Sequence, residues 1–87
     1  MKKIVKIDTK AGLESLLGER VLLMCSNYFY AGKLVGVNRT SVLLHDASVV
    51  YETGEWSAEK WKDAQLVRRP VYVLISHIEA FMPEKAG

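Results

Sequence analysis

The sequence predicts a mostly β fold, a small five-stranded antiparallel barrel with strongly bent strands. Val, Leu, Tyr and Phe crowd into residues 20–47, and these side chains suit a pleated, half-buried surface. Only Asn27 and residues 38–41 interrupt them, and both breaks have turn chemistry. Gly32 and Gly36 lie within one strand, where glycine usually marks a sharp bend or a close backbone approach. Two such positions indicate the curvature that a small barrel needs.

Length and charge limit the function classes. The chain has 87 residues, which favours one domain, and 12 basic against 10 acidic residues, a net charge of +2 that is too small to indicate nucleic acid. The charge is uneven, because residues 1–45 hold seven basic and three acidic residues, whereas residues 46–87 hold five and seven. A single cysteine, Cys25, favours a reducing compartment. No apolar run approaches the ~18 residues of a membrane span, so we expect a cytoplasmic protein.

The elements follow in chain order. Residues 1–8 are expected to form an N-terminal arm. A helix is expected over residues 9–18, because Asp8 or Thr9 can cap its first turn and Gly18 can end it. Its apolar stripe has helical spacing and consists of Leu13, Leu16 and Leu17. Three strands are expected over residues 19–52.

The second half is expected to hold a long loop and two more strands. The loop covers residues 53–66, and Ser57 is a plausible N-cap for a short helix within it. Residues 67–83 are expected to form the fourth and fifth strands, with a break at Ser76 and His77, and residues 84–87 a tail. Pro70 removes one donor from the ladder, so that end of the fourth strand is expected to lie at an edge or a bulge.

The glycines and their neighbours carry a resemblance. The spacing is Gly32-x-Leu34-x-x-Val37-Asn38, a two-residue gap, then Ser41-Val42-Leu43-Leu44-x-Asp46-Ala47. This order resembles the first motif of the Sm-like (LSm/Hfq) family, in which an Asp occupies the position of Asn38. The turn length is most similar to the bacterial Hfq branch. The resemblance extends over residues 12–47 and, more loosely, over residues 71–83.

The resemblance implies a ring. In Sm-like proteins the fourth strand of one subunit pairs with the fifth strand of the next, and such a heterologous contact closes if the rotation allows it. We therefore expect a homo-oligomeric ring of five to seven subunits, since exposed edges of short apolar strands invite pairing. The expected interface residues are Val71, Val73, Ile75, Ile78 and Phe81.

The resemblance also implies binding of single-stranded RNA near the pore, in the manner of an RNA chaperone or regulator. Two loops grip RNA in the family, and here they correspond to Asn38, Arg39, Thr40 and Ser41 and to Ser76 and His77. Thr40 occupies the position of a base-stacking aromatic residue, and the family's Arg-Gly or Lys-His pair falls on Ile75-Ser76. Arg39 and His77 can contact bases or phosphates. Alternatively, Asn38 and Ser41 only satisfy turn amides, and Arg39 and His77 are solvated.

Further positive charge is available from other basic residues. The candidates for secondary contacts with RNA phosphates are Lys2, Lys3, Lys6, Arg68 and Arg69. Tyr28 and Tyr30 can stack on RNA at the other face of a ring or pack at its rim.

The sequence favours no enzyme, metal or cofactor. His45, Asp46 and His77 make a poor metal site without paired cysteines. Cys25 with His45 is conceivable as a nucleophile and base, but a cysteine among Leu and Met is typical of a buried apolar residue. The chain has no phosphate-binding glycine loop and no carboxylate pair.

The loop tryptophans leave a second function open. Trp56 and Trp61 can form a patch for a protein partner, because aromatic residues are enriched at interfaces, or they can fold the loop back onto the barrel. The alternative function is therefore a structural or protein-docking Sm-like ring that has lost RNA binding. A third reading is a monomeric adaptor with an SH3-type barrel.

Overall fold

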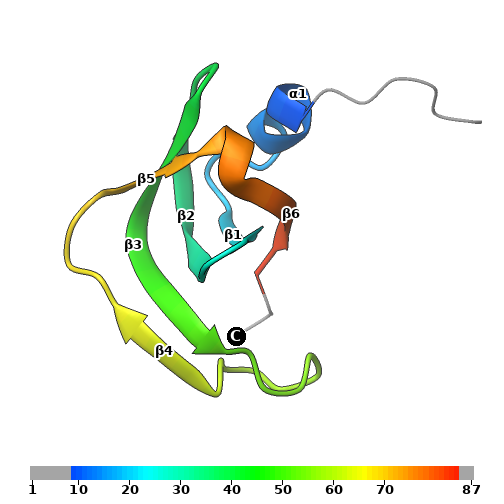
Figure 1. Cartoon of the computed structure of the whole chain (residues 1–87), viewed down its shortest axis with the longest axis vertical. Coiled ribbons are helices and arrows are strands. Elements are labelled where there is room, and N and C mark those ends of the chain that lie inside the picture. The colour runs from blue at the N-terminus through cyan, green and yellow to red at the C-terminus, as the bar shows by residue number, and fades with distance from the viewer. Residues whose placement is uncertain (1–8, 85–87) are drawn as a thin grey trace, which may run out of the picture.

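Three long strands form the centre of the sheet in the computed structural model, which describes residues 9–84. They are β1 (Arg20–Cys25), β2 (Phe29–Val37) and β3 (Ser41–Glu52), and each pairs antiparallel with the next (Figure 1). The polar breaks at Asn27 and at residues 38–41 fall between them, as predicted.

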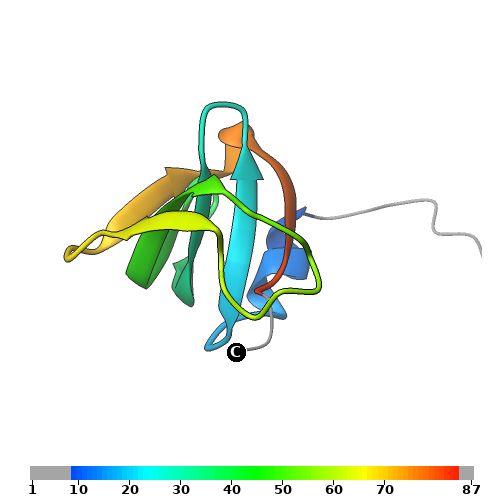
Figure 2. The same ribbon diagram turned by 90° about the horizontal axis from the view of Figure 1, so that it is seen from below.

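Three shorter strands complete the sheet. They are β4 (Asp63–Leu66), β5 (Val71–Leu74) and β6 (Ile78–Pro83), and the one-turn 3₁₀ helix η1 (Ile75–His77) joins the last two. The strand order is β4-β3-β2-β1-β6, and β5 also pairs with β3. In Figure 2, β4 and β5 lie on one side of the molecule and β6 on the other. The prediction of a mostly β, antiparallel fold is confirmed, but the described sheet is open and has six strands.

Strand β3 bends sharply, and the bend lets it serve two partners. Its first half pairs with β5 and its second half with β4, both on the edge away from β2. Between the halves, Asp46 has a φ of 51°, in the left-handed region. Gly32 lies opposite the bend, and a Cβ atom there would come within 3.0 Å of the Cα atom of Ala47. The predicted close backbone approach is confirmed at Gly32. At Gly36 the contact would be an ordinary 3.5 Å to the Cβ atom of Leu43.

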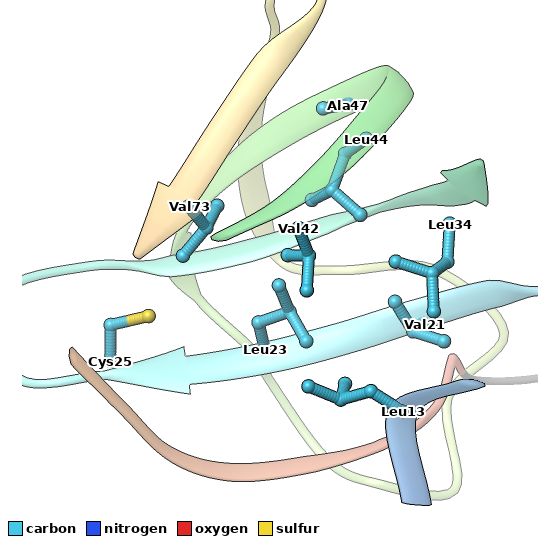
Figure 3. Packing of buried hydrophobic residues seen from close by; sticks show 9 residues of the cluster. All are labelled: Leu13, Val21, Leu23, Cys25, Leu34, Val42, Leu44, Ala47 and Val73. Carbon is cyan, nitrogen blue, oxygen red and sulfur yellow. The ribbon is translucent and has the colours of Figure 1, made fainter. Parts of the chain in front are cut away.

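Two apolar clusters hold the bent sheet together. Figure 3 shows the larger one, which lies between β1, β2, β3, β5 and the helix α1 (Thr9–Glu14). Its buried members are Leu13, Val21, Leu23, Cys25, Leu34, Val42, Leu44, Ala47 and Val73. The smaller cluster contains Leu22, Ala31 and Val50. Successive strand residues face opposite sides of a sheet, so β1 supplies Val21 and Leu23 to one cluster and Leu22 to the other.

Helix α1 is shorter than the expected element over residues 9–18. It ends at Glu14, and turns with i→i+3 hydrogen bonds continue to Gly18, whose φ is 88°. Of the predicted leucine stripe, Leu13 is buried, Leu16 packs against the larger cluster and Leu17 is 45% exposed. The expected arm over residues 1–8 and residues 85–87 of the expected tail lie outside the described residues.

The predicted helix in the loop over residues 53–66 is wrong. Residues 56–60 form turns and bends, and Asp63–Leu66 is a strand, β4, paired with β3. The unoccupied second half of the β3 edge offers backbone partners that outweigh the weak helical pattern. The predicted fourth strand over residues 67–75 is interrupted around Pro70, and only Val71–Leu74 remains a strand. Among residues 9–84, the helices are too short to cross a bilayer.

Candidate functional site

Two turns that are distant in the sequence lie side by side at the end of the β3–β5 ladder. Ser41 is paired with Leu74 in this ladder. The backbone N–H of Ile75 donates to the carbonyl oxygen of Thr40 at 2.9 Å, which extends the pairing by one residue. The structure therefore joins η1, with Ser76 and His77, to the turn over residues 38–41. These are the two segments that the sequence analysis singled out for RNA.

The side chain of Asn38 fixes the shape of its turn. Its Oδ1 atom accepts hydrogen bonds from the backbone N–H groups of Thr40 and Ser41, both at 2.9 Å. The N–H of Asn38 donates to the carbonyl oxygen of Ser41 at 2.9 Å. This is the Asx-type turn expected of Asn. Within residues 9–84 the Nδ2 amide of Asn38 has no hydrogen-bond partner, so its two N–H groups are available to a ligand.

The polar groups of both turns are open to solvent. Arg39, Thr40, Ser76 and His77 are exposed. Arg39 forms no ion pair within the described part of the chain, so its charge is not neutralised there. The turns therefore offer a cation, amide donors and an imidazole on one end of the sheet.

Tyr72 is a residue that the sequence analysis missed. It is 70% exposed and lines a groove of about 220 Å³ together with Gly36, Val37, Asn38, Ser41 and Leu43. The alternation along β5 contained the signal, because Val73 points into the core and Tyr72 and Leu74 must then point outward. The groove places an aromatic ring beside the turn that lacks one.

The predicted subunit-interface residues face the chain's own core. Val73 is buried there, and its four companions Val71, Ile75, Ile78 and Phe81 pack against the same cluster. The exposed side chains of β5 are Tyr72 and Leu74.

Within residues 9–84, the outer edges of β5 and β6 carry backbone groups that pair with no other strand. Among the described residues, β5 pairs only with β3, and β6 pairs only with β1. Because the N–H of Ile75 points toward β3, strand alternation turns the N–H groups of Tyr72 and Leu74 to the opposite, open edge. Such an edge is a template for another strand.

His77 also lines a second groove with the tyrosines of the β1–β2 hairpin. This groove, of about 240 Å³, is also lined by Cys25, Tyr28, Tyr30 and all of β5, so Tyr72 lines both grooves. Burial raises the pKa of the Cys25 thiol, with a smaller contribution from Glu79, and burial also raises the pKa of Tyr30. A raised thiol pKa does not suit a nucleophile.

The remaining candidates lie on other surfaces. Arg68 and Arg69 are exposed and line a groove of about 400 Å³ with His45 and Asp46, away from the two turns. No group of three His, Cys, Asp or Glu side chains within residues 9–84 is arranged to hold a metal ion. Lys2, Lys3 and Lys6 lie outside the described residues.

The two tryptophans have different surroundings. Trp61 packs against the smaller core cluster, and its indole Nε1 donates to Glu84 at 3.0 Å. Trp56 is 53% exposed and meets Trp61 edge to face, with ring centroids 6.1 Å apart. The loop is therefore folded onto the sheet through Trp61, and Trp56 presents a ring to solvent.

Comparison of the chain with protein-family models, with curated proteins and with solved structures gives no match.

Proposed function

We propose that this chain is an Sm-like subunit that assembles into a homo-oligomeric ring and binds single-stranded RNA through the turn at Asn38–Ser41 and the adjacent Ser76 and His77. The hydrogen bond from Ile75 to Thr40 carries the proposal, because it holds these two segments together. Arg39 is exposed and forms no ion pair within residues 9–84, and the Nδ2 amide of Asn38 has no partner there, and both observations support the proposal further. The ligand class is RNA that is not base-paired, since its bases and phosphates are both accessible to such turns.

The ring is proposed from the edges of the sheet. The bent sheet is open, and β5 and β6 each have one edge without a partner in the described chain. Pairing of β5 in one subunit with β6 in the next continues the sheet between subunits. A chain of this length also gains from burying more apolar surface, because small domains bury a modest fraction of theirs.

Native mass spectrometry of the protein with and without short RNA tests both halves of the proposal. The expected result is one species of five to seven subunits that gains whole RNA molecules. A monomer of 9.8 kDa at micromolar concentration would overturn the ring. A ring that shifts with neither uridine-rich nor adenosine-rich RNA at low salt would overturn RNA binding.

Leu74→Pro tests the edge pairing in particular. Leu74 has a φ of −72°, which proline adopts, and its N–H points to the open edge. The subunit should therefore fold, as judged by circular dichroism, but assemble poorly because one edge donor is missing. Leu74→Ala is the matched control, since it removes the side chain and keeps the donor. Equal assembly of both variants would contradict pairing through β5.

A protein-docking ring is the second candidate, and the exposed ring of Trp56 favours it. Trp56→Ala should abolish capture of a protein partner and leave the oligomer intact, whereas RNA binding should be unaffected. Loss of RNA binding in this variant, with the partner still captured, would contradict this reading.

A further inference from the structure

The outward face of β2, β3 and β5 has a depression at Gly36. Gly36 is paired with Leu43, and Leu43 is paired with Tyr72, so the three residues lie in a row across the sheet on one face. Among residues 9–84, a Cβ atom at Gly36 would meet only Leu43 within 4 Å. The missing side chain therefore leaves space above the sheet, with Leu43 as an apolar floor and the exposed ring of Tyr72 as a wall.

The turn closes one end of this depression with polar groups. Asn38 and Ser41 line the same groove. The Oδ1 atom of Asn38 already accepts hydrogen bonds from backbone N–H groups of the turn. A ligand can therefore bind to the Nδ2 amide of Asn38, which is a hydrogen-bond donor. Arg39 follows directly and contributes a cation that no residue within 9–84 neutralises.

The dimensions and chemistry match a single nucleobase. The groove of about 220 Å³ is smaller than the ~300–1,000 Å³ of pockets that enclose drug-sized ligands. An aromatic wall suits a flat ring, an amide donor suits the acceptor atoms on a base edge, and a neighbouring guanidinium suits a phosphate. An apolar peptide side chain would use the wall and floor but neither of the polar groups.

We infer that Tyr72 is the stacking platform for one base of single-stranded RNA, which lies over Gly36 and Leu43 with its edge toward Asn38. This rests on the proposed RNA binding and identifies the aromatic residue of the site, which the turn itself lacks. Stacking contributes affinity without a phosphate contact. Loss of stacking should therefore weaken binding at every salt concentration equally, whereas loss of a cation should also change the salt dependence.

Fluorescence anisotropy with labelled short uridine-rich and adenosine-rich RNA tests the inference over a series of salt concentrations. Tyr72→Ala should weaken binding by about tenfold, the size of one lost base stack, and leave the slope of log affinity against log salt unchanged. Gly36→Val should weaken binding similarly, because it fills the depression without requiring backbone movement at an ordinary φ. Tyr72→Phe keeps the ring and should bind like the original protein.

Leu74→Ala is the matched control, because Leu74 is the other exposed side chain of β5 and does not line the groove. Its affinity should stay within about twofold. Equal losses for Leu74→Ala and Tyr72→Ala would overturn the inference, as would full affinity in both Tyr72→Ala and Gly36→Val. Either result leaves RNA binding itself in place. If the original protein binds no RNA, the proposed function fails and the inference fails with it.

Crosslinking with thiouridine-substituted RNA gives a test that needs no variant. The expected adduct is on the peptide that contains Tyr72. Adducts confined to the groove at Arg68 or to the β1–β2 hairpin at Tyr28 and Tyr30 would overturn the assignment of the base to Tyr72.

Discussion

Trp61 and Glu84 join the long loop to the end of the last strand. The indole Nε1 of Trp61 donates to the carboxylate of Glu84 at 3.0 Å, and Arg20 at the start of β1 forms an ion pair with the same carboxylate. The Arg20 guanidinium also donates to the carbonyl oxygen of Asp46 at 3.2 Å, so the network reaches the bend of β3. Hydrogen bonding to Glu84 raises the pKa of Arg20, which remains charged at all relevant pH values.

The tryptophans should differ in their effect on stability. Trp61→Ala should lower the free energy of unfolding by about 2 kcal/mol or more, because it removes a half-buried ring and leaves Glu84 with one donor fewer. Trp56→Ala should cost about 1 kcal/mol, the value of an aromatic pair. Urea denaturation of the two variants measures the difference, and equal losses would contradict the different placement of the rings.

The two glycines of β2 should also differ. Gly32→Ala should lower the free energy of unfolding by about 1–3 kcal/mol, because its Cβ atom would lie 3.0 Å from the Cα atom of Ala47 and 3.2 Å from the carbonyl oxygen of His45. Gly36→Ala is the matched control and should be neutral or slightly stabilising, since its new contact is ordinary and alanine restricts the unfolded chain. Thermal or urea unfolding distinguishes them, and a harmless Gly32→Ala would show that the strands can separate at the bend.

Arg39 should determine part of the salt dependence of RNA binding. Arg39→Ala should weaken binding to all sequences by a similar factor and reduce the slope of log affinity against log salt by about one, because one phosphate contact is lost. Arg68→Ala serves as a control, since Arg68 lies on a different groove. An unchanged slope in Arg39→Ala would show that this guanidinium does not contact a phosphate.

Alkaline pH should weaken the fold through Cys25. Its thiol pKa is raised from the ordinary 9.0 chiefly by burial, so the unfolded chain releases this proton at lower pH than the folded chain does. The free energy of unfolding should then be insensitive to this group below about pH 9 and should fall as pH rises toward the folded pKa. Tyr30, whose pKa is raised from 10.0 mainly by burial, should add to the fall at higher pH.

Cys25→Ala should be less stable at neutral pH, because it truncates a core side chain, but its stability should decline less steeply above about pH 9. Urea midpoints at a series of pH values measure both effects. Parallel declines in the two proteins would assign the alkaline loss to other groups.

Local chemistry in the sequence predicted the first half of the fold well. The apolar strands over residues 20–47, the turns between them and the close approach at Gly32 all follow from side-chain types that act within a few residues. The strand β4 does not, since Asp63–Leu66 alternates polar and apolar residues over only four positions, and all four residues are exposed, so no buried face marks the strand. Strand β4 forms because the second half of the β3 edge offers backbone partners to it. The bend at Asp46 separates that half of the edge from the half that pairs with β5.

The candidate site divides in the same way. Asn38 and its turn were recognisable from the polar break after an apolar strand, and the adjacency of His77 followed only from the resemblance. Tyr72 lines the groove because it is paired with Leu43 across β3 and β5. The local sequence does not show that these two strands pair. Strand parity would have identified it once Val73 was assigned to the core.

The bend of β3 separates two surfaces whose sequences can change independently. The half before Asp46 supports the turn at Asn38 and the strand β5, whereas the half after it supports β4 and the tryptophan loop. Substitutions or insertions in the loop between Gly54 and Trp61 can therefore accumulate without altering the geometry at Asn38, provided that Trp61 itself is kept. In evolutionary terms, a single continuous strand gives this small protein two independently variable ends.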